Sequence, residues 1–226
     1  MLKSKFVFAL EGNIGAGKTT VLNILKEKLS HKHNLIYAPE PVESFKFSEI
    51  NGTIFRPLDA FYHNPVRYGE SFQWWVRRCY EDQLQSLAKI STNENVIIVD
   101  RGIYSSSIFV KAQVETGSIN ELGGAVLLHE INKTIERYYG KMDKFGVDKL
   151  YYLDTPIEQC MKNLQTRNRH EETSYKDMKR HLEIIQSYYK EYVNDFERTR
   201  GICNVRCNYF SNPIDTVADI IEFLEK

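Results

Sequence analysis

The chain has 226 residues, a length that suits one large α/β domain or two small ones, and no linker, repeat or low-complexity tract divides it. Its 30 basic residues balance 30 acidic ones, so the formal net charge is zero, which argues against a general binder of nucleic acid. No stretch is long enough to cross a membrane, and the first apolar run begins too early for a signal or transit peptide. We therefore expect a single domain over residues 1–226, located in the cytoplasm, without a nucleic-acid or membrane partner.

Apolar runs alternate with helical patterns along the chain. Short apolar runs predict strands at 5–10, 35–38, 96–99, 150–153 and about 202–209. Apolar residues at helical spacing predict helices, most clearly at 18–31, 69–91, 120–139, 174–198 and from 213 onwards. This order predicts an α/β fold in which helices cover both faces of a five-stranded parallel sheet. Ligands of such sheets bind beyond the carboxyl ends of the strands, so the residues that follow each strand are the informative ones.

The segment after the first predicted strand, GNIGAGKT, matches the phosphate-binding loop (P-loop) pattern G-x-x-x-x-G-K-[ST]. Its three glycines allow backbone N–H groups to approach an oligophosphate, and the following helix adds the positive end of its dipole. The Lys18 ammonium is expected to reach the β- and γ-phosphates, and the Thr19 hydroxyl to bind Mg²⁺. The pattern predicts that a nucleoside triphosphate such as ATP is bound by Gly12, Asn13, Ile14, Gly15, Ala16, Gly17, Lys18, Thr19 and Thr20.

Charged residues follow three further predicted strands. Glu40 lies between two prolines, which restrict the backbone and hold its carboxylate in place, although alone it would be read as a surface acid. Asp100 directly follows an apolar strand, as the magnesium-binding acid of many P-loop proteins does, and Arg101 beside it can meet phosphate charge. The run RNRHEE at 167–172 is either a solvated charged face or a lid that closes over the γ-phosphate.

Aromatic side chains concentrate in residues 58–85, with Gln73 among them. Rings at helical spacing are more often core than ligand contacts, and on this ground Trp75 and Cys79 are assigned to packing. Gln73 is different, because its amide can pair with a donor and an acceptor on a base edge while rings enclose the base. The segment is therefore a candidate nucleoside pocket.

Together these motifs resemble the family of deoxycytidine, deoxyguanosine and mitochondrial thymidine kinases, which includes insect and viral members. The resemblance covers nearly the whole chain and rests on EGNIGAGKT (11–19), PEPV (39–42), FYHNPVRYGESFQ (61–73), DRGIYS (100–105) and RNRHEE (167–172). It implies a deoxynucleoside as phosphate acceptor, ATP or another nucleoside triphosphate as donor, Mg²⁺, a lid at about 163–174 and a homodimer. It leaves open feedback inhibition by a deoxynucleoside triphosphate.

The resemblance also implies roles for individual residues. Glu40 would accept the proton of the nucleoside 5′-OH, and Arg101 would pair with Glu40 and the transferring phosphoryl group. Arg167 and Arg169 would clamp the phosphates, while Tyr62 and Glu172 would hold the 3′-OH and Thr19 and Asp100 would bind Mg²⁺. The nucleoside pocket as a whole would comprise Glu40, Phe45, Leu58, Phe61, Tyr62, Phe72, Gln73, Val76, Tyr80, Arg101, Ser106 and Glu172.

The chain departs from the family pattern in three places. Asp100 is shorter than the usual glutamate, and Asn163 stands where several members carry a lid arginine. Tyr80 and Ser106 replace the arginine and aspartate that enforce base recognition in the deoxycytidine kinase branch. This last change favours the mitochondrial thymidine kinase and insect branch, with thymidine and deoxycytidine as the leading substrates.

Three alternatives remain open at this stage. A thymidylate kinase shares the loop, lid and sheet, but the acidic pair Glu40 and Glu43 suits a neutral hydroxyl acceptor better than a phosphate dianion. A catalytically silent assembly subunit of this fold would be marked by loss of Lys18, Glu40 or Arg101, all of which are present. A P-loop switch protein would have no use for a nucleoside pocket.

The predicted helix at 120–139 carries more apolar residues than one core-facing stripe needs. A helix buried within one chain would explain this, and so would a two-fold contact with a second copy. The dimeric state of the family that the chain resembles favours the second explanation.

Overall fold

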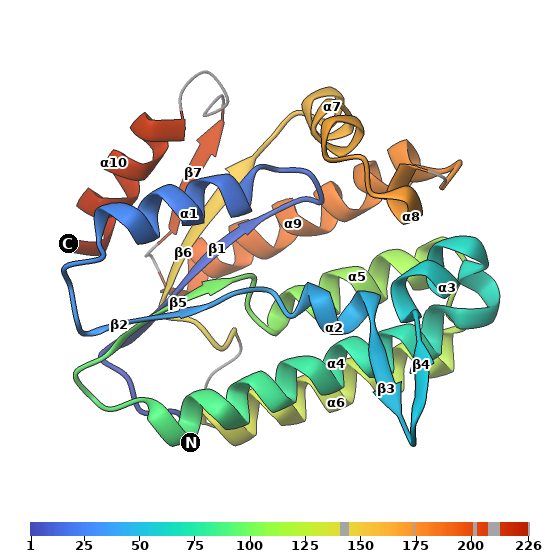
Figure 1. Ribbon diagram of the computed structural model, residues 1–226, viewed down its shortest axis with the longest axis horizontal. Helices are drawn as coiled ribbons and strands as arrows, with labels where there is room; N and C mark the ends of the chain where they lie inside the picture. Colours follow the sequence, from blue (N-terminus) through green and yellow to red (C-terminus); the bar gives the residue numbers. More distant parts are fainter. Residues whose placement is uncertain (141–144, 174, 201–202, 208–212, 226) are drawn as a thin grey trace.

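The computed structural model describes residues 1–140, 145–173, 175–200, 203–207 and 213–225. Within these ranges the strands of the main sheet run parallel in the order β2-β5-β1-β6-β7 (Figure 1). Their bounds are β1 (Phe6–Gly12), β2 (Leu35–Ala38), β5 (Val96–Asp100), β6 (Lys149–Asp154) and β7 (Cys203–Cys207). The α/β class with a parallel sheet flanked by helices, expected from the sequence, is confirmed.

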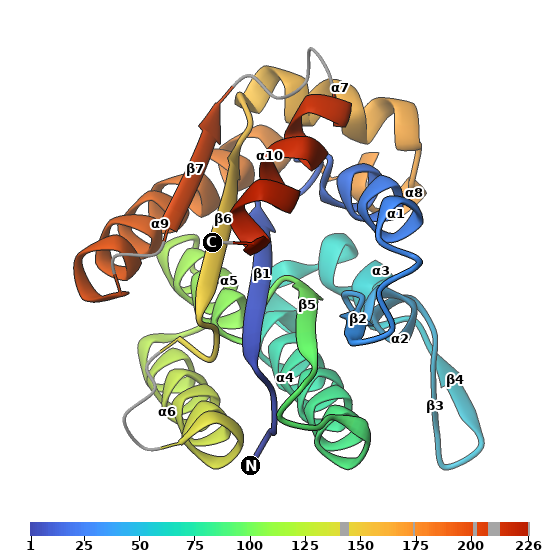
Figure 2. The same ribbon diagram turned by 90° about the vertical axis from the view of Figure 1, so that its left-hand side faces the viewer.

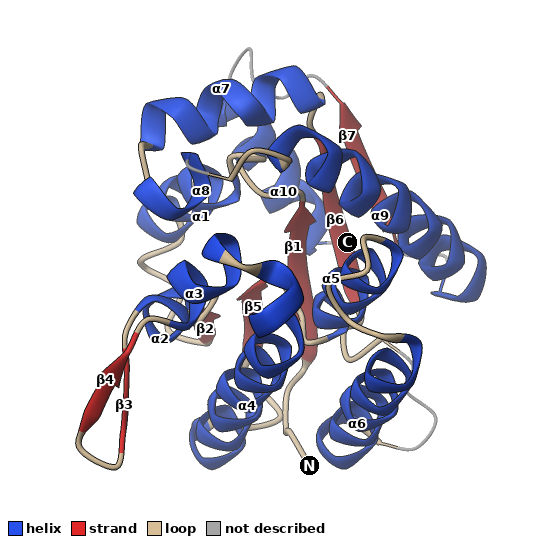
Figure 3. Ribbon diagram, turned by 90° about the vertical axis from the view of Figure 1, so that its right-hand side faces the viewer, coloured by secondary structure: helices blue, strands red, loops and turns tan. Residues whose placement is uncertain are grey.

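Helices cover both faces of this sheet. One face is covered by α1 (Lys18–Lys28) and α10 (Pro213–Glu225), which pack against each other, as Figure 2 shows. The other face is covered by α4 (Pro65–Ile90), α5 (Tyr104–Glu115), α6 (Glu121–Tyr139) and α9 (Met178–Arg200). The short helices α2 (Val42–Lys46), α3 (Pro57–His63), α7 (Ile157–Arg167) and α8 (His170–Thr173) gather around the carboxyl ends of the strands (Figure 3). None of the helices in the described ranges is long and apolar enough to cross a membrane.

The central strands are buried on both faces. Phe8, Ala9, Leu10 and Ile97 have no exposed surface, and Ile98 has almost none. A strand covered on both faces needs apolar side chains at every position, which explains why these segments read as continuous apolar runs rather than alternating ones. Because β1 and β5 pair in parallel, their carboxyl ends lie side by side, with Leu10 opposite Asp100.

A short antiparallel hairpin, β3 (Ser48–Ile50) and β4 (Thr53–Phe55), was not expected from the sequence. It projects from the body of the molecule, and Ile54 in it is 72% exposed (Figure 3). Asn51 and Gly52 at its tip both have positive φ angles, 51° and 77°, as a two-residue hairpin turn requires. The Asn-Gly pair was the available signal for this hairpin.

Two helices differ from their predicted form. Helix α4 begins at Pro65, four residues before the predicted start, because the Asn64 side chain accepts the backbone N–H of Arg67 at 3.1 Å and caps the helix there. Helix α5 was not singled out, because it is buried on most sides and therefore shows no amphipathic stripe.

Candidate active site

A cavity of about 550 Å³ lies beyond the carboxyl ends of β1, β2 and β5. The structure brings most of the predicted site residues onto its wall: Ile14, Gly15, Ala16, Gly17, Lys18, Thr19, Thr20, Glu40, Phe45, Leu58, Phe61, Tyr62, Phe72, Gln73, Val76, Tyr80, Arg101, Ser106, Arg167, Arg169 and Glu172. The predicted residues Gly12, Asn13 and Asp100 are buried and lie outside this lining. Two regions of the chain with different predicted tasks, phosphate binding and nucleoside binding, thus share one cavity.

The P-loop forms one wall of the cavity and leads into α1. Gly15 and Gly17 have φ angles of 75° and 89°, and a Cβ at Gly15 would lie 2.7 Å from a backbone oxygen of Cys160, so glycine is required there. The Lys18 Nζ donates to the backbone oxygens of Gly12 and Asn13 at 3.1 and 3.2 Å. Burial, together with the Arg101 guanidinium, lowers the pKa of Lys18 to about 8.

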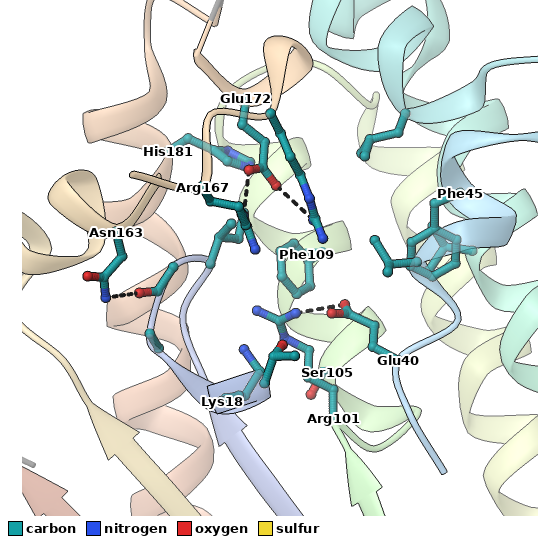
Figure 4. A pocket seen from close by; sticks show the side chains of 18 of the residues that line it. Lys18, Glu40, Phe45, Arg101, Ser105, Phe109, Asn163, Arg167, Glu172 and His181 are labelled. Carbon is teal, nitrogen blue, oxygen red and sulfur yellow. Dashed lines mark hydrogen bonds and ion pairs between the residues drawn. The ribbon is translucent and has the colours of Figure 1, made fainter. Parts of the chain in front are cut away.

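Glu40 and Arg101 form an ion pair in the middle of the cavity (Figure 4). The Arg101 Nη1 donates to the Glu40 Oε1 at 2.7 Å, and the Arg101 Nη2 donates to the backbone oxygen of Gly12 at 3.0 Å. Burial alone would raise the pKa of Glu40, but the charges of Arg101, Lys18 and Arg169 hold it below its usual value. Glu40 is therefore ionised at neutral pH, as a general base must be.

Asp100 lies behind the P-loop with its Oδ1 buried and without a hydrogen-bond partner in the described part of the chain. Burial raises the pKa of Asp100, and the neighbouring Lys18 charge opposes this shift. Thr19, at the start of α1, is exposed to the cavity. An unused carboxylate oxygen and a hydroxyl are oxygen ligands of the kind Mg²⁺ prefers, so these two residues fit the predicted metal.

The opposite end of the cavity is built from aromatic rings. Phe61 and Phe72 stack with their centroids 4.9 Å apart and an interplanar angle of 12°, and Phe45 lies 6.3 Å from the ring of Tyr80. Two buried polar atoms among these rings, the Gln73 Oε1 and the Ser106 Oγ, have no partner in the described ranges. Buried polar atoms of native proteins are normally paired, so these two mark a place where a polar ligand edge fits.

The predicted lid residues form a cluster of charges at the rim (Figure 4). Arg167 and Arg169 both donate to the Glu172 carboxylate, at 2.5 and 3.4 Å. The lid arginines therefore contact the residue predicted to hold the 3′-OH. The Asn163 amide, at the position of the missing lid arginine, donates to the backbone oxygen of Gly15 at 2.7 Å and ties α7 to the P-loop.

Among the residues at or beside the cavity that were not predicted from the sequence, four are polar or aromatic side chains of particular interest. Glu11 is completely buried at the end of β1, and a lone acid ending an apolar strand was the signal for it. Phe109, Gln113 and His181 line the cavity from α5 and α9, and no spacing pattern distinguished them from core residues. Burial lowers the pKa of His181 to about 4, so its imidazole is neutral at physiological pH.

The family model for deoxynucleoside kinases matches residues 8–225 of the chain. The chain belongs to the deoxynucleoside kinase family. A probable deoxycytidine kinase of fowlpox virus (strain NVSL) is 30% identical over 181 residues, which cover 78% of this chain and 67% of the viral protein. Human mitochondrial thymidine kinase 2 is 31% identical over 171 residues, or 75% of this chain and 58% of the human one. The homologues are named as kinases of deoxynucleosides, which are phosphotransferases.

The relatives are named for different nucleosides. Besides the deoxycytidine and thymidine kinases, a deoxyguanosine kinase of Dictyostelium discoideum is 29% identical over 72% of this chain. The match spans 50% of that relative and 58% of the human one, so the chain covers about half of their length. The fold is similar to that of a deoxyadenosine kinase from M. mycoides solved with dCMP and a flexible dCDP bound. The TM-score is 0.73 over 97% of this chain and 98% of the other, at 17% identity. Family membership therefore sets the class of protein and leaves the base to the pocket itself.

Proposed function

We propose that this kinase phosphorylates the 5′-hydroxyl of deoxyribonucleosides with Mg-ATP or another nucleoside triphosphate as donor, in a single kinase domain over residues 1–226 that acts in the cytoplasm. The observation that carries the proposal is the ion pair of Glu40 with Arg101 at 2.7 Å, in a cavity with the P-loop on one side and an aromatic pocket on the other. A carboxylate held there lies between the two places that a phosphate donor and a nucleoside would occupy. Membership of the family supports the same reaction.

The charged residues supply the parts that in-line phosphoryl transfer needs. The Glu40 carboxylate accepts the proton of the 5′-OH as that oxygen attacks the γ-phosphorus. Lys18, Arg101 and the P-loop N–H groups neutralise the charge that spreads over the phosphate oxygens. Asp100 and Thr19 would hold the Mg²⁺, which supplies further neutralisation of the β- and γ-phosphates.

The lid cluster suggests what changes when substrates bind. Arg167 and Arg169 leave Glu172 and turn to the phosphates, whose charge exceeds that of one carboxylate. The freed Glu172 carboxylate then accepts the 3′-OH, and the Tyr62 hydroxyl donates to the same group. Burial and the nearby Glu172 charge raise the pKa of Tyr62, so its phenol stays protonated and able to donate.

The aromatic pocket favours pyrimidines in this proposal. Without an arginine–aspartate pair, Gln73 is the main polar contact to the base, and its amide can match the O4 and N3–H of thymine or, turned over, the N3 and N4–H₂ of cytosine. The Tyr80 ring, only 3% exposed, takes up space that the second ring of a purine needs. Thymidine and deoxycytidine are therefore the proposed preferred substrates.

We also infer that two copies of the chain pair through α6. Leu127, Ile131 and Ile135 of this helix are buried within the chain, whereas Leu122 and Val126 are 76% and 44% exposed. Exposed apolar residues in line on one helix fit a two-fold contact. Light scattering at micromolar concentration should give twice the mass of one chain, and a single-chain mass would contradict the dimer.

A product assay with Mg-ATP tests the reaction. ADP release should be measured with each of the four deoxynucleosides and each of their monophosphates, with Glu40→Gln as the inactive control. Turnover with nucleosides alone is expected. Turnover confined to monophosphates would favour a thymidylate kinase, and no turnover with any acceptor would favour a silent assembly subunit.

A further inference from the structure

We propose that Glu11 and Tyr189 are positioning residues that hold Arg101 in its catalytic orientation without touching the substrate. The inference rests on the proposed function, because it assigns a task in phosphoryl transfer to two buried groups outside the cavity lining. It is carried by an unbroken chain of hydrogen bonds from Glu11 to Glu40.

Glu11 is a buried acid with an unusual number of donors around it. Its carboxylate accepts the backbone N–H of Gly102 at 2.7 Å, the Ser105 hydroxyl at 2.6 Å and the Tyr189 hydroxyl at 3.1 Å. Burial raises the pKa of Glu11, and the hydrogen bonds from Ser105 and Gly102 together with the charges of Arg101 and Lys18 oppose the shift. Burying a carboxylate is costly unless its oxygens are paired, so the three donors account for its place in the core.

The first of these bonds fixes the turn that presents Arg101. Arg101 has a φ angle of 61°, in the left-handed region that residues with a Cβ seldom adopt. Its own N–H donates to the backbone oxygen of Leu10 at 3.2 Å, and the next N–H, of Gly102, is held by Glu11. The N–H groups of Arg101 and Gly102 are therefore both hydrogen-bonded to the end of β1. A strained backbone conformation of this kind persists where the surrounding structure holds it in place.

Tyr189 fixes the side chain of Arg101. Its hydroxyl accepts the Arg101 Nε–H at 3.2 Å while it donates to Glu11, and its ring stacks on Tyr152 with centroids 5.4 Å apart. The other two guanidinium nitrogens donate to Glu40 and to the backbone oxygen of Gly12. Each nitrogen of the guanidinium thus has a separate partner, and of these three partners only Glu40 is proposed to accept the proton of the substrate.

This arrangement has a consequence for the acidity of Glu40. The charged and titratable groups that face Glu40 are Arg101, Lys18, Arg169, Asp100 and Tyr80, and Arg101 is the strongest of those that lower its pKa. Without its hydrogen bond to the Tyr189 hydroxyl, the Arg101 guanidinium would be oriented less firmly and would form its ion pair with Glu40 less often. Loss of the Tyr189 hydroxyl should therefore raise the pKa of Glu40 and move the acid limb of kcat to higher pH.

Tyr189→Phe removes the one oxygen and keeps the stacked ring. The kcat with thymidine should fall about tenfold, the usual effect of losing a hydrogen bond to a charged group, with the acid limb shifted upward. The KM for thymidine should stay within about twofold, because no substrate contact is lost. Tyr188→Phe, on the same helix with its ring under Lys111, is the matched control and should leave kcat and the pH profile unchanged.

A double-substitution cycle separates positioning from general packing. If Tyr189 acts through Arg101, then Tyr189→Phe should cost nothing further in an Arg101→Lys background. Glu11→Gln, which keeps the shape and loses the charge, should show the same dependence on Arg101. If the effects of the Tyr189 and Arg101 substitutions on kcat multiply, the inference is overturned. It is also overturned if a folded Tyr189→Phe enzyme shows no shift in the acid limb of kcat. Failure of the wild type to phosphorylate any deoxynucleoside would instead overturn the proposed function.

Discussion

The two ends of the cavity are built in different ways. The phosphate end, which is the end proposed to bind the phosphate donor, is made of consecutive backbone from Ile14 to Thr20 and of charged residues that closely follow strands. The base end is made of side chains from α2, α3, α4 and α5, brought together from positions as far apart as Phe45 and Ser106. The first is a local structure, and the second is a tertiary structure whose shape we propose to select one nucleoside from another.

The polar groups at the two ends also differ in whether they already have hydrogen-bond partners within the protein. At the phosphate end, Lys18, Glu40 and Arg101 already have protein partners that a substrate must displace or join. At the base end, the Gln73 Oε1 and the Ser106 Oγ have no partner within the described ranges. We therefore expect changes at the phosphate end to lower turnover of every substrate alike, and changes at the base end to redistribute turnover among substrates.

The largest effect should follow from Lys18→Ala. Removing the ammonium from the phosphate end should abolish turnover with all four deoxynucleosides, because the β- and γ-phosphates lose their main side-chain charge. Rates and the thermal midpoint should be measured together, with Lys28→Ala, exposed on the same helix, as the control. An active Lys18→Ala enzyme would mean that the loop is not the phosphate site.

Glu40→Gln tests the group at the junction of the two ends. The amide keeps the size and the hydrogen bonding of the carboxylate but cannot accept the proton, so kcat should fall about 10²–10⁴-fold. Nucleoside affinity, measured by calorimetry, should change little. Glu43→Gln, an exposed acid three residues on, is the control. If Glu40→Gln retained half of the wild-type kcat, Glu40 would be a structural turn residue and not the general base.

The pH dependence at the phosphate end should differ between free and bound enzyme. Lys18 is charged below its pKa of about 8, so kcat/KM for ATP should decline as pH rises through 8. Bound phosphates favour the charged ammonium, so the alkaline limb of kcat should lie at higher pH. Direct chromatography of the product avoids the pH dependence of coupling enzymes. If the alkaline limbs of kcat and of kcat/KM for ATP fell at the same pH, this assignment of Lys18 would be contradicted.

The smallest effect, and the only one on selectivity, is expected at the base end. Tyr80→Ala should open space for a second ring and raise purine relative to pyrimidine kcat/KM by about 10- to 100-fold, since steric discrimination is worth about 1–3 kcal/mol. The ratio is taken within one variant and so does not depend on how much of it is folded. Tyr68→Ala, on the same helix but outside the cavity, should leave the ratio unchanged. A wild type that prefers purines would refute this account of the pocket.

Residues with a local pattern could be predicted, and residues without one could not. The apolar runs placed the strands of the sheet, and the P-loop placed the site, because each is encoded by a few neighbouring residues. His181 was missed because a buried histidine on an amphipathic helix has the spacing of any core residue. The lid cluster was expected at the right segment, but its pairing with Glu172 depends on how α7 and α8 fold back over the cavity.

The sequence by itself determined the family and the α/β class, and it predicted the P-loop at the phosphate end, since short motifs and continuous apolar runs can be recognised without the fold. Only the tertiary structure decided how Arg101 is held. Its partner Tyr189 lies 88 residues away, and Tyr189 contacts Glu11 across 178 residues. No local pattern links such positions, because their contact arises only when α9 packs on the sheet and buries all three groups together. The same holds for the base end, where the packing of helices sets the shape of the aromatic pocket.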